Sequence, residues 1–121
     1  MSTHTARLVW NRTTETMDPK TYARDHQWRF DSGVTVAASA AAGPAIPPGT
    51  VGADTVDPEE VVVAALASCH MLWFLHLCQR NSVVVESYVE RTSTTLQTHG
   101  SKGVVTGVDL DPHLIERARR S

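Results

Sequence analysis

The feature that most constrains this chain is a long apolar segment, Val61 to Cys78, with the sequence VVVAALASCHMLWFLHLC. The tetrapeptide before it, DPEE at 57–60, supplies a capping aspartate and a proline suited to the first helical position. Its two glutamates complement the positive end of a helix dipole. We therefore predict one helix that runs to about Arg80, where Asn81 provides a stop signal.

This helix is near the length that a membrane span needs, about 20 residues. It contains Ser68, His70 and His76, and the rest of the chain alternates like soluble β structure. We therefore favour the buried helix of a globular protein over a membrane span. A helix that is apolar on all sides needs cover on all sides. A chain of 121 residues has little material for that, so we expect a partner subunit.

The sequence on both sides of the helix is typical of β structure. Strands are predicted at Thr5–Trp10, Tyr22–Phe30, Val34–Val36, Val83–Thr98 (one long strand or two short ones) and Val104–Leu110. Turns are predicted at Asp31–Gly33 and His99–Gly103, a long ordered loop at Ala37–Val56, a break at Asp111-Pro112 and a short helical turn at Leu114–Arg120. We predict a single α+β domain over residues 1–121.

The two cysteines, Cys69 and Cys78, both lie in the apolar segment. On one helix they would point to opposite sides, roughly 13 Å apart along the axis. A disulfide needs Cα atoms about 4.4–6.8 Å apart, so these two cannot pair within an intact helix. The N-terminal residues contain no apolar core of signal-peptide length. A reducing, cytoplasmic location fits both observations.

The formal net charge of −2 argues against a general nucleic-acid binder, which would usually be basic. The dense basic cluster of Arg117, Arg119 and Arg120 is interpreted as a solvated tail, with a phosphate-binding patch as the alternative.

The segment from Asp57 to Met71, DPEEVVVAALASCHM, resembles the signature of the OsmC/Ohr family of osmotically inducible and organic hydroperoxide resistance proteins. In that signature a reactive cysteine follows a glutamate by ten residues, the spacing of Glu59 and Cys69. The resemblance extends over roughly Thr5 to Pro112. It implies an antiparallel sheet with a long central buried helix, in an intertwined homodimer whose sites lie at the subunit interface.

The resemblance also implies thiol-dependent reduction of organic hydroperoxides, an antioxidant role in the oxidative stress response. Cys69 would be the nucleophile, an arginine would stabilise its thiolate, and Glu59 would orient that arginine. Arg24 is the best match in the N-terminal β region, and Arg7, Arg12 and Arg29 are the alternatives. The expected partners are the hydroperoxide, an external thiol reductant and a second subunit. No cofactor, metal, nucleic acid or membrane is expected.

The sequence departs from the family at its C-terminal side. Peroxidases of the family carry a second, resolving cysteine on an added helix-and-strand segment, and no cysteine follows Cys78 here. The C-terminal part of the family fold is therefore expected to be missing. Three interpretations stay open: a truncated peroxidase, a peroxidase that works with one cysteine, or a non-catalytic dimeric protein with a binding or structural role.

The chemistry requires a cysteine that ionises near neutral pH, although a free cysteine has a pKa near 8.5. An arginine suits this task because it stays charged and can hold a carboxylate in two-pronged fashion. The alternatives are that Cys69 is a small core residue, that Glu59 only complements the helix dipole, and that Arg24 is an exposed strand residue. On a straight helix Glu59 would lie about 15 Å from Cys69. Their contact would require a break or offset, for example near Ala67-Ser68.

Two histidines lie close to Cys69 in the sequence. His70 would point about 100° away from Cys69, so it is a poor base for that thiol within the helix. His76 would share a helical face with Cys69 and Trp73 but lie about 10 Å along the axis. A metal site from these histidines and both cysteines would need ligands from several faces, and the spacing fits no zinc pattern. The apolar residues Met71, Leu72, Trp73 and Phe74 are interpreted as core or subunit-contact residues, with a substrate pocket as the alternative.

Overall fold

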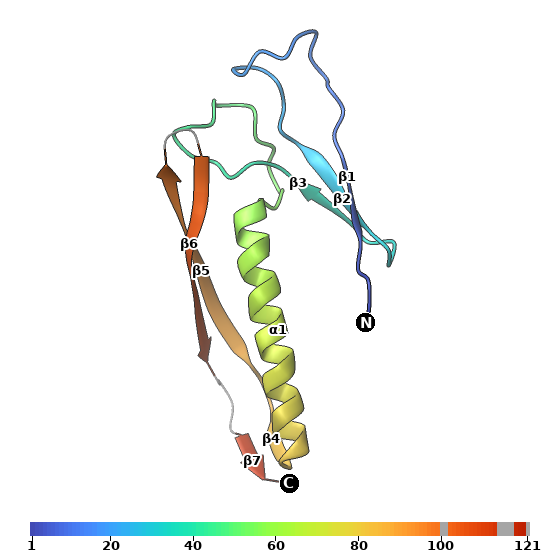
Figure 1. The fold of residues 1–121 in the computed structure, drawn as a ribbon, viewed down its shortest axis with the longest axis vertical. Coiled ribbons are helices and arrows are strands. Elements are labelled where there is room, and N and C mark those ends of the chain that lie inside the picture. Colours follow the sequence, from blue (N-terminus) through green and yellow to red (C-terminus); the bar gives the residue numbers. More distant parts are fainter. Residues whose placement is uncertain (100–101, 114–117, 121) are drawn as a thin grey trace. The chain divides into compact units, whose positions relative to one another are not determined.

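The computed structural model describes residues 1–99, 102–113 and 118–120. The chain forms two compact units, residues 1–58 and residues 59–121. Along the described residues, three strands precede one long helix and four strands follow it (Figure 1). The strand pairs are antiparallel, as the α+β prediction requires.

The first unit contains a three-stranded antiparallel sheet in the order β1-β2-β3. Its strands are β1 (Ala6–Val9), β2 (His26–Phe30) and β3 (Thr35–Ala38). Leu8 is paired with Trp28, and Trp28 with Val36, so these three residues form one row across the sheet. Gly33 has a φ of 90° in the turn between β2 and β3, which confirms the turn that the sequence predicts there.

The strand predicted at Tyr22–Phe30 begins four residues late, at His26. The physical reason lies in the backbone of Arg24, whose N–H donates to the carbonyl of Thr50 at 2.9 Å. This bond ties the segment before β2 to the long loop instead of to β1. Arg24 is consequently a loop residue, which corrects its interpretation as a strand residue.

The loop that follows β3 is closed at its base by two backbone hydrogen bonds. Ser39 N–H donates to the Val56 carbonyl at 2.8 Å, and Val56 N–H donates to the Ala37 carbonyl at 3.0 Å. Gly52 N–H also donates to a carboxylate oxygen of Asp25 at 2.7 Å. The loop is thereby fastened to β3 and to the residue that precedes β2.

The second unit contains the predicted helix, α1 (Pro58–Arg80), which ends as the sequence indicates. Asn81 N–H donates to the Leu77 carbonyl at 3.1 Å, and the Asn81 side chain donates to the same oxygen at 2.7 Å. Ser82 then takes a φ of 55°, a left-handed conformation that stops the helix. The helix is continuous, so the break considered near Ala67-Ser68 does not occur.

The side chains of α1 are mostly exposed within the single chain, where Val63 alone is buried on this helix. The large apolar residues exposed on it are Val62, Leu66, Leu72, Trp73 and Leu77. By length and composition α1 could cross a membrane, but the core helix of a soluble protein passes the same test. One such helix is therefore weak evidence for a span.

The strands of the second unit form two antiparallel pairs, β4 with β7 and β5 with β6. Their bounds are β4 (Val83–Val85), β5 (Val89–His99), β6 (Lys102–His113) and β7 (Ala118–Arg120). Two predictions are corrected here. The strand β6 continues through Asp111-Pro112, because Pro112 is paired opposite Glu90. A helical turn was predicted at Leu114–Arg120, but residues 118–120 form a strand paired with β4. The rest of that predicted turn lies outside the described residues.

Candidate functional site

The side chain of Cys69 lies exposed near the middle of α1. This exposure disagrees with the interpretation of Cys69 as a buried core residue of the single chain. Cys78 is half-buried on the same helix, and both cysteines are free thiols. Because α1 is continuous, the predicted separation of roughly 13 Å holds, and neither cysteine can form a disulfide with the other within the chain.

Glu59 occupies the first turn of α1 and is half-buried. Its Oε2 atom is buried and has no hydrogen-bond partner among the described residues. On the unbroken helix it lies about 15 Å along the axis from Cys69, so the two residues do not meet within the helix. A buried carboxylate oxygen without a partner is costly, which makes Glu59 more than an ordinary residue of a solvated first turn.

Arg24 belongs to the first unit, where its guanidinium is held in one position. Nη1 donates to the carbonyl of Tyr22 at 3.1 Å, and Nη2 donates to the carbonyl of Pro19 at 3.2 Å. The guanidinium carbon also lies 4.1 Å from the centre of the Tyr22 ring, a cation–π contact. Trp10 fastens the same segment by donating its indole N–H to the Ala23 carbonyl at 2.9 Å.

Arg24 lines a cavity of about 410 Å³ whose walls are mostly aromatic and apolar. The other lining residues are Trp10, Met17, Tyr22, His26, Ser39, Ala40 and Pro58. Ser39 is fully buried, and its hydroxyl has no hydrogen-bond partner among the described residues. The pocket is open, and the Arg24 guanidinium and the buried Ser39 hydroxyl contribute little to its surface, so its almost wholly apolar walls suit an apolar group.

The three alternative arginines are exposed and take no part in lining this cavity with Arg24. Arg12 donates to the carbonyl of Glu15 at 3.2 Å, and Arg29 donates to the side chain of Gln27 at 3.1 Å. Arg7 faces solvent on β1. Of the four candidates, Arg24 is the one that lines this cavity.

His26, beside Arg24 in this cavity, has a defined tautomer. Its Nε2 lies 2.9 Å from the indole Nε1 of Trp28, which can only donate, so Nε2 is the acceptor. Its proton is therefore on Nδ1, which donates to the carbonyl of Arg24 at 2.8 Å. The ring and the two bonds hold the backbone of Arg24 against the start of β2.

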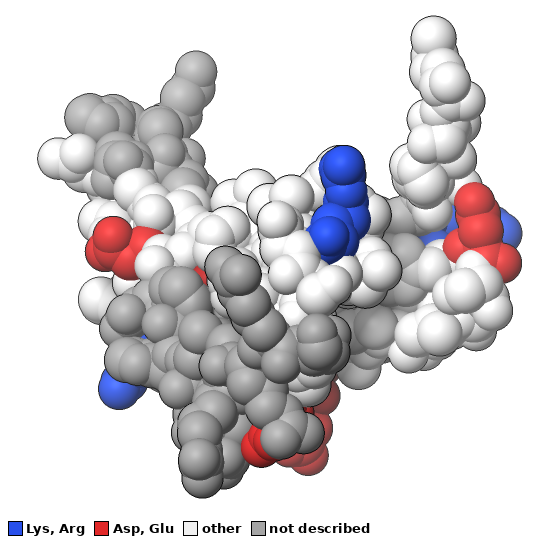
Figure 2. Space-filling view, turned by 90° about the horizontal axis from the view of Figure 1, so that it is seen from below, with Lys and Arg blue, Asp and Glu red and all other residues white. Residues whose placement is uncertain are grey.

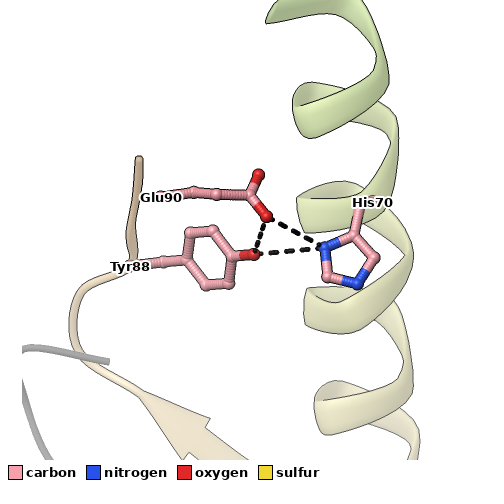
Figure 3. A network of polar contacts seen from close by, with 3 residues as sticks. All are labelled: His70, Tyr88 and Glu90. Atoms are coloured by element: carbon pink, nitrogen blue, oxygen red, sulfur yellow. Dashed lines mark hydrogen bonds and ion pairs between the residues drawn. The ribbon is translucent and has the colours of Figure 1, made fainter. Parts of the chain in front are cut away.

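In the second unit, His70, the residue that follows Cys69 in the sequence, forms a polar network with Tyr88 and Glu90 that the sequence did not predict (Figure 3). Nδ1 of His70 lies 3.3 Å from Oε1 of Glu90 and 3.3 Å from the hydroxyl of Tyr88. The Tyr88 hydroxyl in turn donates to the same Glu90 oxygen at 3.2 Å. The only sequence signal for this network is the presence of a histidine directly after the predicted nucleophile.

Burial sets the electrostatics of this network. The side chain of Glu90 is 5% exposed, and its Oε2 is buried without a partner among the described residues. Burial, followed by the neighbouring Glu90 carboxylate, raises the pKa of Tyr88 above its ordinary value of 10.0. The phenol consequently stays protonated near neutral pH and serves as a hydrogen-bond donor to Glu90.

Two other kinds of site, a metal site and a basic surface patch, find little support among the described residues. These residues contain no group of three or more His, Cys, Asp or Glu side chains that could hold a metal ion. On the face drawn in Figure 2, the Lys and Arg side chains of the described residues lie singly and do not gather in a patch.

The chain is similar to a protein of known structure. A solved structure of an OsmC-like protein of unknown function from Vibrio cholerae matches it with a TM-score of 0.84 and 38% sequence identity. The match covers 95% of this chain and 75% of the other. No protein-family model and no curated protein matches the chain. Identity and coverage at this level mean that the protein belongs to the OsmC-like family.

Proposed function

We propose that the protein reduces organic hydroperoxides with Cys69 as its nucleophile. The single observation that carries this proposal is the exposed, unpaired thiol of Cys69, at the signature position of the resemblance, on the long helix of an OsmC-like protein. Exposure matters because a peroxide must reach the sulfur along the axis of its O–O bond. A cysteine sealed in an apolar core would be inert.

In this proposal Arg24 supplies the positive charge that holds Cys69 as a thiolate, and Glu59 orients the arginine. Two features support these roles. Arg24 lines an apolar cavity, and its guanidinium is held there by neutral partners, two backbone carbonyls and the Tyr22 ring, which leave its positive charge in place. Glu59 has a buried carboxylate oxygen that still needs a donor. An arginine fork is the donor that best satisfies such an oxygen.

We further propose that the protein works as an intertwined homodimer in the cytoplasm, with α1 as the central buried helix. The exposed leucines and tryptophan of α1 support this, because they leave a wide apolar surface uncovered in one chain. In this proposal a second copy covers the leucine and tryptophan side chains, at the hydrophobic gain expected for buried apolar area, and leaves Cys69 open at the edge of the interface. The same pairing brings residues of both subunits to one site.

The catalytic cycle then needs a thiol from another molecule. Oxidation of Cys69 yields a sulfenic acid, which condenses with a thiol to give a disulfide and water. Cys78 cannot serve, because it is held far along the same helix. A small dithiol or a dithiol-bearing protein would therefore form that disulfide with Cys69, and its second thiol would then return Cys69 to the free thiol.

The direct test is a peroxidase assay with cumene hydroperoxide and either dithiothreitol or dihydrolipoamide as reductant. Cys69→Ser should reduce the rate to the uncatalysed background. The matched control is Cys78→Ser, which removes the other thiol of the same helix and should keep at least about half of the activity. A wild-type rate no higher than that of Cys69→Ser would refute the proposal.

A second candidate function is a non-catalytic dimeric protein with a binding or structural role. It is favoured by the inability of the two cysteines to resolve one another. Iodoacetamide alkylation of Cys78→Ser across pH separates the two candidates. An activated thiol reacts quickly at pH 6 to 7, whereas an ordinary one reacts appreciably only near or above about pH 8.5.

A further inference from the structure

We propose that His70 donates a proton to the oxygen that leaves when Cys69 cleaves a hydroperoxide, with Glu90 and Tyr88 as positioning residues. The inference deepens the proposed function and rests on it. It concerns a part of the reaction that the thiol, Arg24 and Glu59 leave unassigned, namely the fate of the alkoxide. An alkoxide is a poor leaving group, so its departure benefits from a proton supplied in the transition state.

The contacts of the imidazole determine where its protons are. Glu90 is a carboxylate acceptor 3.3 Å from Nδ1, so Nδ1 carries a proton whether the ring is neutral or charged. The Tyr88 hydroxyl donates its proton to the same Glu90 oxygen. The lone pairs of the Tyr88 oxygen are then free to accept from Nδ1 of His70. These two partners fix the ring on one side of α1, much as a carboxylate fixes a catalytic histidine in hydrolases.

The second ring nitrogen, Nε2, is on the side of the ring away from Glu90 and Tyr88 (Figure 3). It has no hydrogen-bond partner within the part of the chain that the structure describes, and the His70 side chain is 49% exposed. Nε2 can therefore exchange its proton with solvent and with a molecule bound at the helix surface. Cys69, which is also exposed, is the preceding residue of the helix.

The position of His70 suits the leaving oxygen better than the thiol itself. Adjacent helical residues diverge by about 100°, so the imidazole is not aligned to take the thiol proton. The leaving oxygen of a bound peroxide lies one S–O bond and one O–O bond beyond the sulfur. A proton donor that lies to one side of Cys69 can therefore reach the leaving oxygen, even though it is not aligned with the sulfur.

The buried carboxylate balances the charge of the protonated imidazole. Glu90 is 5% exposed, and the donors it has among the described residues are Tyr88 and His70. An imidazolium at 3.3 Å supplies the positive charge that a buried carboxylate requires. After it gives up the Nε2 proton, the ring is left as the neutral Nδ1–H tautomer, still bonded to Glu90. The ring therefore does not have to move during the reaction.

The proposed step balances as follows. The Cys69 thiolate attacks the terminal oxygen of R–O–O–H, so an S–O bond forms and the O–O bond breaks. Sulfur is oxidised to the sulfenic acid Cys–S–OH, and the peroxide is reduced to R–O⁻. Nε2–H of the His70 imidazolium gives its proton to R–O⁻, which leaves as the alcohol. Solvent, which took the thiol proton at the start, then restores the proton to Nε2.

The test compares two peroxides whose leaving groups differ in basicity, in a Cys78→Ser background so that Cys69 is the single thiol. Cumene hydroperoxide releases a basic alkoxide that needs a proton, whereas peracetic acid releases acetate, which does not. The second-order rate of Cys69 oxidation is measured by stopped flow. His70→Gln should lower the rate with cumene hydroperoxide by about 10²-fold. It should change the rate with peracetic acid by less than about twofold, since no proton is needed.

Substitution of the positioning residues should also slow the reaction with cumene hydroperoxide and not that with peracetic acid, but the loss of rate should be smaller. Glu90→Gln keeps the shape of the side chain and should lower the cumene hydroperoxide rate by about tenfold, again without affecting peracetic acid. The matched control is His76→Gln, which removes another histidine of α1 whose ring faces Trp73 instead of a carboxylate. It should leave the ratio of the two rates unchanged. Circular dichroism confirms that each variant remains folded.

Equal losses with both peroxides in His70→Gln, or no loss with either, would overturn the assignment of His70 and leave Cys69 as the nucleophile. A Cys78→Ser protein whose Cys69 reacts with both peroxides no faster than free cysteine at the same pH would instead overturn the proposed function. The two failures are therefore distinguishable in one set of measurements.

Discussion

Nδ1 of His70 lies 3.3 Å from Oε1 of Glu90, so an exposed residue of α1 is joined to a buried carboxylate at the start of β5. The rings of Phe74 and Tyr88 add a second contact between the same two regions, with their centres 5.6 Å apart. These contacts fix the position of the chain after β4 against the helix. They therefore connect the second unit's strand region to α1 near the turn that carries Cys69.

Tyr88→Phe should lower the free energy of unfolding by about 1 kcal/mol at pH 7, because it removes one hydrogen bond to Glu90. The raised pKa of Tyr88 sets the sign of the pH dependence. Between the ordinary value of 10.0 and the raised pKa, the folded state keeps a proton that the unfolded state has lost. Wild-type stability should therefore fall as the pH rises above about 10, and the variant should fall less steeply. Urea denaturation at pH 7, 9 and 10.5 measures both effects, and parallel curves would contradict the assignment.

Gly52→Ala should destabilise the first unit by about 1 kcal/mol. An added Cβ would collide with the carboxylate of Asp25 and displace it from its 2.7 Å hydrogen bond with Gly52 N–H. Gly43→Ala in the same loop is the matched control, since nothing lies within 4 Å of the position that its added methyl group would take. Chemical denaturation should show no loss for Gly43→Ala beyond a few tenths of a kcal/mol.

The same site allows a double-mutant cycle. If the Asp25 bond is what Gly52→Ala disrupts, the substitution should cost little in an Asp25→Ala background. Additive losses from the two substitutions would mean that the loop is held by other contacts.

Leu72→Asp should disrupt the proposed homodimer, because it places a charge on the apolar surface of α1. Leu8→Asp on β1 is the control, since the two leucines are comparably exposed in the single chain, at 59% for Leu72 and 66% for Leu8. Light scattering after size-exclusion chromatography should give twice the 13.2 kDa chain mass for the wild type and for Leu8→Asp. Leu72→Asp should give the single-chain mass. A protein that needs detergent to leave the membrane fraction would contradict the dimer and favour a spanning α1.

Arg24→Gln should slow the oxidation of Cys69 by cumene hydroperoxide by about tenfold or more, since it removes the charge proposed to hold the thiolate. Arg29→Gln removes a nearby exposed arginine whose side chain bonds to Gln27, so its rate should match the wild type. Stopped-flow oxidation at pH 7 compares the two variants. Equal rates for both would transfer the role to a different cation.

The extent to which the sequence predicts this structure follows from how local each signal is. The start and end of α1 were predictable because a capping tetrapeptide and Asn81 act within one turn of the helix. The predicted end of β6 was wrong because Pro112 is a local break signal, whereas its pairing opposite Glu90 is a tertiary interaction. Proline has no backbone N–H to donate to a neighbouring strand. In a two-stranded ladder each strand also has an unpaired outer edge, where the loss of that N–H costs little.

The residues of the candidate site also differ in whether a local sequence pattern or only a tertiary contact reveals them. The resemblance to the family signature makes Cys69 and Glu59 candidates, and the structure adds that the helix between them is unbroken. The setting of Arg24 depends on backbone bonds to a loop far along the chain, which no periodicity reveals. The network of His70, Tyr88 and Glu90 escaped prediction because residues distant in the sequence meet only in the folded chain.

The central claim is that Cys69 itself accepts oxygen from a hydroperoxide, and trapping of its sulfenic acid tests this most directly. One equivalent of cumene hydroperoxide is added to the reduced protein with dimedone present, and the modified residue is located by peptide mass spectrometry. The account predicts stoichiometric dimedone on Cys69 within seconds and little on Cys78. An unmodified Cys69, or equal slow labelling of both cysteines, would contradict it.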